Sequence, residues 1–376
     1  MKKLLYLAAI VLLASCTGAK KSNLPLLDAK NFDKEYKGKK ISLYTLESGN
    51  GLTMQVTNFG IRVVTLFTPD KNGKYEDIVL GHPNIDEYIN YKGERCLGSI
   101  VGRYGNRIAK GTFTLDSVTY HLPLNNNGQT LHGGFDGYDM RVWNVDSVSS
   151  NSIHFSYVSP DGDQGFPGEV KMKVVYTLTP DNEFKITYEA TTDKPTYVNL
   201  THHSFFNLKG EGNGDNSDNL LMIKASKYTP IDSVWIPTGE IADVAGTPFD
   251  FREPTAIGKR INEDNQQLKN GKGYDHNWVI DRTDSNDVEL VASLYDPTNG
   301  RFMEVFSDQP GVQFYSGNFL DGKVIGKYGK AQNLHAAVAL ETQKFPDAPN
   351  HPNFPSTLLK PGETYHQTCI YKFSVK

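Results

Sequence analysis

Short segments of alternating apolar and polar residues recur along the chain from residue 41 onward. A period of two residues is typical of a β-strand with one buried face, because successive side chains point to opposite faces. The alternation predicts strands most clearly at residues 52–58, 112–115, 170–176 and 184–188. Runs of Asp, Asn, Pro and Gly that favour turns separate such segments at residues 70–73, 125–128 and 180–182. Many short strands with turns between them favour an antiparallel sandwich or barrel.

Helical periodicity is scarce in the same region. Residues 84–91 and 262–269 are each predicted to form a couple of helical turns, beginning at the N-caps Asn84 and Asn262. No shift in composition and no internal repeat divides residues 41–376. We therefore expect one large all-β domain over these residues, built as an antiparallel β-sandwich.

The N-terminus has the pattern of an export signal. A positive start, Met-Lys-Lys, precedes an apolar stretch over residues 4–13 that is too short to span a bilayer. The next residues, Leu-Ala-Ser-Cys, resemble a bacterial lipobox, which implies cleavage before Cys16 and its lipidation. We expect a signal peptide at 1–15 and a polar, lysine-rich, lipidated tether at 16–40, on an exported protein that faces the periplasm rather than the cell exterior. A plain secretory signal is the alternative.

Composition excludes several classes of protein. With 376 residues, of which 38% are hydrophobic and 11% aromatic, the chain can bury a sizeable core and is not globally disordered. The net charge is −4 and no basic run is interleaved with aromatic residues, so nucleic acid is not an expected partner. No Walker loop, G-x-S-x-G elbow, H-E-x-x-H helix or C-x-x-C pair occurs.

Two further features leave alternatives open. Cys96 and Cys369 could form a disulfide in an oxidising compartment, but their separation in sequence does not decide it. The loop 209–219 is rich in Asp, Asn and Gly, so bound calcium is possible there, although the loop lacks EF-hand spacing. A solvated turn is the simpler interpretation of this loop.

Two adjacent histidines lie in an extended segment, residues 198–208. On a strand, one imidazole would point into the domain and the other away from it. Histidine is the side chain best suited to exchange a proton near neutral pH. A lone His in a β-protein is more often a structural residue. A functional role for His202 or His203 therefore needs support from other segments of the chain.

Two polar groups precede this strand. Asn106 and Arg107 lie among glycines at residues 102–111 and offer hydrogen-bond donors suited to sugar hydroxyls or a carboxylate. His132 is followed by two glycines, which let a ligand or another backbone approach closely. Each signal alone is weak, because an Arg on a strand is most often a surface residue.

Three more candidates follow the histidines. Asp275 stands just before an apolar strand, where a turn residue is the ordinary interpretation. Gln313 stands beside two aromatic residues, as in a sugar-binding wall. Glu341 follows five small or apolar residues, so it is expected at the end of a buried strand, or exposed where that strand leaves the core. Burial would raise the pKa of this carboxyl toward the range of a general base.

Taken in order, these segments resemble the aldose 1-epimerase (galactose mutarotase) family along nearly the whole domain. The matching pieces are residues 102–108, 131–134, 199–208, 273–277, 311–315 and 339–343, followed by Phe-Pro-Asp at 345–347. One such piece would mean little, but six in sequence are highly specific. The resemblance implies a large antiparallel β-sandwich, the galactose mutarotase-like supersandwich, with a sugar site in a cleft on one sheet.

The resemblance also implies roles for single residues. His203 is expected to be the acid and Glu341 the base, with the carboxylate helping to keep the imidazole protonated. The expected sugar-binding residues are Asn106, Arg107, His132, Phe205, Asp275 and Gln313. The family often has Tyr at the position of Phe205, so a hydroxyl contact is missing there. It usually has Asn at the position of His202, which strand alternation should point away from the site.

The implied activity is the interconversion of α and β anomers of free hexoses such as glucose and galactose. Ring opening and closure transfer only protons, so no cofactor and no metal ligand is required. We expect a monomer whose partners are a small sugar and, through the lipid, a membrane. One alternative is a non-catalytic carbohydrate-binding lipoprotein. Another is a glycosidase with two carboxylates, of which only Glu341 has a convincing setting.

Overall fold

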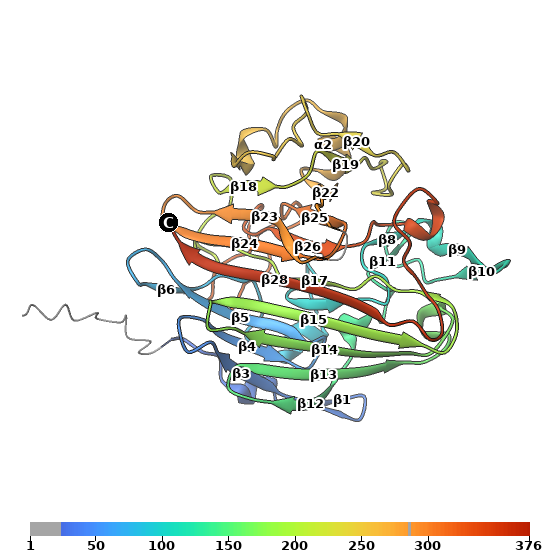
Figure 1. Cartoon of the computed structure of the whole chain (residues 1–376). Coiled ribbons are helices and arrows are strands. Elements are labelled where there is room, and N and C mark those ends of the chain that lie inside the picture. Colours follow the sequence, from blue (N-terminus) through green and yellow to red (C-terminus); the bar gives the residue numbers. More distant parts are fainter. Residues whose placement is uncertain (1–23, 285–286) are drawn as a thin grey trace, which may run out of the picture.

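The computed structural model describes residues 24–284 and 287–376, so the predicted signal peptide and Cys16 lie outside the described residues. Its largest layer is an antiparallel nine-stranded sheet (Figure 1). In spatial order its strands are β12 (Asn144–Val148), β13 (Ser152–Ser159), β14 (Val170–Leu178), β15 (Glu183–Thr192), β28 (Tyr365–Val375), β24 (Arg301–Ser307), β23 (Glu289–Tyr295), β18 (Leu220–Ile223) and β21 (Thr255–Ala256). Burial alternates along β14, β15 and β28, so one face of this sheet lies on the core and the other meets solvent.

Two smaller antiparallel sheets cover the core face. The four-stranded sheet consists of β3 (Leu43–Glu47), β4 (Thr53–Thr57), β5 (Arg62–Pro69) and β6 (Tyr75–Asp77). The five-stranded sheet consists of β20 (Ala242–Asp243), β19 (Lys227–Thr229), β22 (Asp275–Val279), β25 (Gly311–Tyr315) and β26 (Ala339–Gln343). Buried hydroxyls tie the layers together: Tyr176 donates to the Ile61 carbonyl and Tyr371 to the Leu340 carbonyl, each over 2.9 Å. The predicted β-sandwich and its four clearest strands are confirmed.

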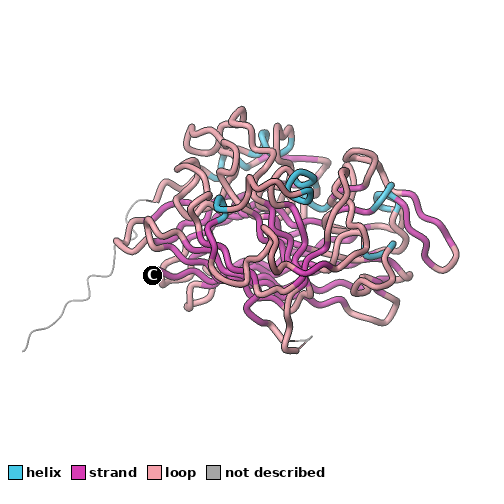
Figure 2. The backbone as a smooth tube through the Cα atoms, turned by 90° about the horizontal axis from the view of Figure 1, so that it is seen from above, coloured by secondary structure: helices cyan, strands magenta, loops and turns pink. Residues whose placement is uncertain are grey.

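The remaining elements are short, and Figure 2 shows that helices lie among the loops while strands form the body. The paired short strands are β1 (Lys34–Tyr36) with β2 (Lys39–Ile41), β7 (Ser99–Val101) with β17 (Thr201–His203), β8 (Arg107–Ile108) with β11 (Thr130–Leu131), β9 (Thr112–Leu115) with β10 (Val118–His121), and β16 (Thr196–Tyr197) with β27 (Leu358–Leu359). The 3-10 turns are Ala29–Phe32, Ala109–Gly111, Tyr138–Met140, Asp163–Gly165, Ile257–Lys259 and Ala348–Asn350. None of the helices in the described residues is long and apolar enough to cross a membrane.

Both predicted helices exist, but one begins later than expected. Helix α1 (Ile85–Ile89) is capped by the Asn84 side chain, as predicted. Helix α2 (Gln266–Gly271) is capped by Asn265 rather than Asn262, because the Asn265 carbonyl oxygen reaches the backbone N–H groups of the first turn. The capping residue thus lies three residues after the predicted one, and the helix begins correspondingly later.

The N-terminal segment corrects the expected tether. Residues 24–40 do not lead loosely to the domain: β1 and β2 form a hairpin, and Phe32 is fully buried against Tyr88, with ring centroids 6.3 Å apart. The Leu27 N–H also donates to the Gln55 side chain over 2.9 Å. A few apolar anchors among many lysines hold this segment on the domain, and the lysine-rich composition concealed them.

The two remaining cysteines do not pair. Cys96 and Cys369 are buried free thiols. Burial raises the pKa of each to about 12, so neither is a ready thiolate.

The five-stranded sheet positions the polar residues of interest. Its strands β22, β25 and β26 are buried on both faces, although β26 is the edge strand. One face carries Trp278, Phe314 and other apolar side chains that belong to the core. By alternation the other face carries a polar row, in which Gln313 lies between Asn277 and Glu341 on the neighbouring strands.

Candidate active site

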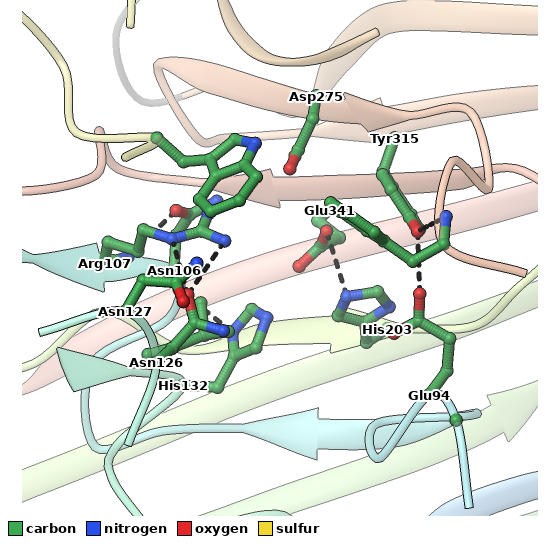
Figure 3. Close-up of a pocket in the computed structure, with 14 residues that line it drawn as sticks. Glu94, Asn106, Arg107, Asn126, Asn127, His132, His203, Asp275, Tyr315 and Glu341 are labelled. Carbon is green, nitrogen blue, oxygen red and sulfur yellow. Dashed lines mark hydrogen bonds and ion pairs between the residues drawn. The ribbon is translucent and has the colours of Figure 1, made fainter. Parts of the chain in front are cut away.

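The site centres on one imidazole and one carboxylate that are 138 positions apart in the chain. His203 on β17 and Glu341 on β26 lie with Nε2 and Oε1 3.3 Å apart, and their side chains are only 7% and 2% exposed. The two strands pack against each other, which brings the groups together (Figure 3). The adjacent His202 points the other way: its Nε2 lies 2.7 Å from the Ser204 hydroxyl, and its ring packs against Tyr176 in the core. The prediction that the two histidines face opposite sides is confirmed.

The pair lies at a cavity of about 310 Å³. The lining residues come from segments spread over most of the domain: Gly93, Glu94, Asn106, Arg107, Asn126, Asn127, Leu131, His132, His203, Trp235, Asp275, Tyr315, Phe319 and Glu341. Six of the eight predicted site residues are therefore brought together around one cavity. This volume lies in the range typical of small-molecule sites.

Gln313 and Phe205 were predicted to bind the sugar, but they are not among the residues that line this cavity. Gln313 lies beneath Asp275 and donates to its carboxylate over 2.7 Å. Phe205 is fully buried and stacks behind the His203 ring, with centroids 4.9 Å apart and planes 17° apart. Both residues orient a cavity-lining side chain, and sequence order alone did not distinguish that position from direct contact.

The backbone around Asn106 fixes the protonation of a second imidazole. The Asn106 N–H donates to His132 Nδ1 over 3.1 Å. A backbone N–H can only donate, so Nδ1 carries no proton and the neutral ring must carry its proton on Nε2. Burial lowers the pKa of His132 well below its ordinary value, which keeps the ring neutral. His132 is therefore a hydrogen-bond donor rather than a charge, beside His203 at a ring distance of 5.3 Å.

Arg107 supplies the cation of the cavity. Its guanidinium lies against the Trp235 ring at 5.3 Å and contacts the Asn126 side-chain oxygen at 3.4 Å. Burial lowers the pKa of Arg107, while the negative charge of Asp275 acts against this shift. The planar fork thus keeps a fixed orientation, with donors available to a ligand's oxygens.

Burial shifts the pKa of both groups in the His203–Glu341 pair. Burial lowers the pKa of His203 to about 3. Burial also raises the pKa of Glu341 well above its ordinary value, with Asp275 adding to the shift and Arg107 opposing it. The predicted rise for Glu341 is confirmed. The lowered pKa of His203 runs against the prediction that the carboxylate keeps this imidazole protonated, because burial disfavours the charged forms of both groups.

Comparisons with known proteins match the whole domain. The family model described as aldose 1-epimerase matches residues 42–372. The chain belongs to the aldose 1-epimerase family. The galactose mutarotase of Rattus norvegicus is 44% identical over 324 residues, which cover 86% of this chain and 92% of that protein. The aldose 1-epimerase of Escherichia coli K12 is 36% identical over 341 residues, which cover 89% of this chain and 96% of that protein.

Solved structures agree with this membership in the aldose 1-epimerase family. An aldose epimerase homologue from C. elegans has a TM-score of 0.82 at 31% identity, covering 89% of this chain and 99% of that one. Galactose 1-epimerase from Lactobacillus acidophilus has a TM-score of 0.78 at 28% identity, and the match covers 91% of this chain and 97% of that one. The supersandwich expected from the sequence motifs is thus confirmed.

The geometry of this family member does not suit a metal ion at the pair. Ligand atoms of His132, His203 and Glu341 lie within 4.8 Å of one another. Metal ligation by a neutral imidazole needs an unprotonated nitrogen. In His132 that nitrogen, Nδ1, already accepts the Asn106 N–H, so its other nitrogen presents a proton to the cavity. The three residues fit a sugar's oxygens better than a cation.

The loop proposed for calcium contains its own cation. The Lys209 ammonium lies 2.9 Å from the Asp215 carbonyl oxygen and 2.5 Å from the Asp218 carboxylate. Two oxygens of this loop are therefore engaged by a lysine of the same loop.

Several residues of the cavity were not predicted from the sequence of this aldose 1-epimerase family member, among them Glu94 and Trp235. Glu94 accepts a hydrogen bond from the Tyr315 hydroxyl over 2.7 Å, and burial raises its pKa. Trp235 covers Arg107 from a loop more than a hundred residues away in the chain. Glu94 stands in a polar loop, and Trp235 precedes an ordinary apolar pair, so neither carried a local signal. Only the fold brings them to the site.

Proposed function

We propose that the protein interconverts the α and β anomers of free hexoses of the glucose and galactose type. One observation carries this proposal: Nε2 of His203 and Oε1 of Glu341 meet over 3.3 Å at a sugar-sized polar cavity. The names of the relatives, which include galactose mutarotases and aldose 1-epimerases, support the same reaction.

The chemistry requires one acid and one base. Opening the ring removes the proton of the C1 hydroxyl and adds a proton to the ring oxygen. Glu341 takes the hydroxyl proton and His203 donates to the ring oxygen. The aldehyde then rotates about its C1–C2 bond, and the two residues exchange roles to close the ring on the other face. No electron or group is transferred, so the residues of this chain supply all the chemistry.

The proton needed for this step is already on the pair. Burial favours the protonated form of Glu341, and transfer along the 3.3 Å contact gives the imidazolium and the carboxylate. The positive charge of Arg107 favours the carboxylate form of Glu341. A bound sugar offers a hydroxyl to the carboxylate and a ring oxygen to the imidazolium, which stabilises both charges.

The remaining groups hold the sugar in place. In Figure 3, Arg107 and His132 lie on one side of the pair and Tyr315 and Glu94 on the other, with Asp275 above Glu341. Arg107 and His132 donate, and the carboxylate of Asp275 accepts. Hydroxyls of a hexose both donate and accept, so a ring of such groups suits a free sugar.

Polarimetry tests the proposal. The optical rotation of freshly dissolved α-glucose or α-galactose should relax to equilibrium faster with the protein than in buffer. Binding of sugar without acceleration, across several aldoses, would instead support a non-catalytic carbohydrate-binding protein. Release of sugar from an aryl glycoside would support a glycosidase.

The pH profile provides a separate prediction. The active pair holds one proton, and a second proton joins only near the lowered pKa of His203, about 3. On the alkaline side, the pair loses its proton at the raised pKa of Glu341. We therefore expect kcat/KM to be as high at about pH 5 as at about pH 6.5, and to fall at high pH. An acid limb centred near the ordinary imidazole pKa of about 6.5 would contradict this assignment.

Replacement of Arg107 by Lys tests sugar binding. Lys lacks the planar fork, so the contacts with the sugar and with the Trp235 ring are both lost. We expect KM to rise about 10- to 100-fold with a smaller change in kcat, because a hydrogen bond to a charged group contributes about 1.5–3 kcal/mol. Arg141→Lys, whose guanidinium pairs with Asp136 and Asp163 away from the cavity, is the matched control. An equal effect of both changes on KM would argue against a binding role.

The protein is also an exported, monomeric lipoprotein in this proposal, anchored by Cys16 with its domain facing the periplasm. The support is the sequence pattern of residues 1–16. Labelling cells with a radioactive fatty acid tests it. The wild-type protein should carry the label in the membrane fraction and Cys16→Ser should not, whereas equal labelling of the two would exclude this anchor.

A further inference from the structure

A small annex joins the sugar cavity at its His203 end. The annex has a volume of about 220 Å³, and Glu94, His132 and His203 line both cavities. Glu341 and Asp275 line the sugar cavity but not the annex. Figure 3 shows the same order, with Asp275 beyond Glu341 and Glu94 on the side of His203. The annex therefore extends the cavity from the acid of the catalytic pair, away from its base.

Glu94 is a carboxyl that faces both cavities, and the mechanism above does not use it. Its Oε1 accepts the Tyr315 hydroxyl over 2.7 Å, and that hydroxyl accepts the Phe319 N–H over 2.9 Å. The Tyr315 ring meets Phe205 edge-on at 5.9 Å, and Phe205 stacks on the His203 ring. Glu94 is thus held in a fixed position beside His203.

The second oxygen of this carboxyl is left for a ligand. Among the described residues, no group other than the Tyr315 hydroxyl hydrogen-bonds to Glu94. Burial raises the pKa of Glu94, while the Tyr315 hydrogen bond acts against this shift. A partly buried carboxyl loses contacts with water, and a hydroxyl that enters the annex replaces them.

Arg95 does not supply a free cation beside this carboxyl. It also lines the annex, but its Nε lies 2.8 Å from the Asp139 carboxylate, and its Nη1 donates to the Gly134 carbonyl over 2.8 Å. Asp139 is fully buried, so the two charges offset each other away from a ligand. The described residues that line the annex therefore offer a carboxyl and no unpaired cation.

The covalent structure of a pyranose decides which of its groups reaches the annex. In the proposed mechanism the C1 hydroxyl lies at Glu341 and the ring oxygen at His203. C2 is bonded to C1, and C5 is bonded to the ring oxygen. The substituent on C5 is therefore nearest to the His203 end of the cavity, and in a hexose this substituent is the hydroxymethyl group.

We infer that Glu94 binds the C6 hydroxyl of a hexose in the annex, and that this contact selects hexoses with an uncharged hydroxymethyl group. The inference rests on the proposed function and narrows its substrate class. Pentoses and 6-deoxy sugars lack the hydroxyl. Uronic acids and hexose 6-phosphates would place a second anion beside Glu94, which is unfavourable where water is largely excluded.

Four sugars that differ only at C5 test this inference. Galactose, D-fucose, L-arabinose and galacturonate carry there a hydroxymethyl group, a methyl group, a hydrogen and a carboxylate. Magnetisation-transfer NMR at anomeric equilibrium reports α–β exchange for each of them. We expect kcat/KM for galactose to be about tenfold above that for D-fucose and L-arabinose, as the loss of one hydrogen bond to a carboxyl would give. Galacturonate should have the lowest value.

Variants of Glu94 assign the difference to this residue. Glu94→Ala should reduce the ratio of kcat/KM between galactose and D-fucose from about ten to about one. Glu94→Gln should raise kcat/KM for galacturonate about tenfold, because the change removes the second anion and offers an amide N–H. Asp321→Asn is the matched control, since Asp321 lines a separate surface cavity. It should leave the ratios among the four sugars unchanged.

The outcomes separate the two proposals. Equal kcat/KM for galactose and D-fucose, or a galactose advantage that survives Glu94→Ala, would overturn the inference about Glu94 and leave the proposed function standing. If no sugar exchanges faster than in buffer, the proposed function fails. Calorimetry with galactose and D-fucose then decides the role of Glu94: tighter binding of galactose that Glu94→Ala abolishes supports it, and equal binding or no binding overturns it.

Discussion

Glu341→Gln should lower kcat for mutarotation of α-galactose by about 10²- to 10⁴-fold, the usual contribution of a positioned proton acceptor. Gln has the same shape and keeps a hydrogen bond to the sugar, but it cannot take the proton of the C1 hydroxyl. KM should change little, because the rest of the cavity is intact. Polarimetry at saturating sugar measures the effect.

Glu304→Gln is the matched control for this change. Glu304 lies on β24 of the nine-stranded sheet, away from the cavity, so its loss should leave kcat unchanged. An equal loss in the two variants would point to a general effect on folding, and full activity of Glu341→Gln would remove the base from the mechanism.

His203→Asn should have an effect of similar size, about 10²- to 10⁴-fold in kcat. Asn can still donate a hydrogen bond toward the ring oxygen, but its amide does not release a proton. The proton left on Glu341 would then have no partner across the 3.3 Å contact. The same polarimetric measurement applies, with sugar binding followed separately by calorimetry.

The neighbouring histidine provides a sharp control. His202 is adjacent in sequence, equally buried, and points into the core between Tyr176 and Phe184. His202→Asn should keep kcat within about threefold, since it touches no reacting atom, and lower the melting temperature by loss of packing. A loss of kcat as large as that of His203→Asn would show that side-chain direction on β17 does not decide which histidine takes part in proton transfer.

The fold was largely predictable from local pattern. Alternation placed β9, β14 and β15, because a strand with one buried face repeats every two residues. It also placed β4, although all five residues of that strand are buried. The same rule assigned opposite directions to His202 and His203. The strands β25 and β26 are buried on both faces, and β26 was expected from its run of small and apolar residues rather than from alternation.

A site residue was predictable only where a chemically suitable side chain stands in a recognisable sequence motif. His203, Glu341, Asn106, Arg107 and His132 stand in recognisable segments and all line the cavity. Whether a residue touches the ligand or supports a neighbour depends on packing across strands, which sequence order does not contain. Gln313 and Phe205, for example, lie behind Asp275 and His203, which line the cavity.

The protonation of the pair could not be predicted either. From the sequence, a carboxylate beside an imidazole suggests an ion pair. In the structure both groups are almost completely buried, so desolvation disfavours the charged form of each. The depth of burial sets the balance between the desolvation of the two groups and their mutual attraction. That depth is a property of the whole fold.

A crystal structure of the protein with bound galactose tests the central claim most directly. The account predicts the C1 hydroxyl within about 3 Å of the Glu341 carboxylate and the ring oxygen within about 3 Å of His203 Nε2, the reach required for proton transfer. A sugar bound with its C1 end toward Arg107 and Asn126, or with neither reacting oxygen near the pair, would contradict it.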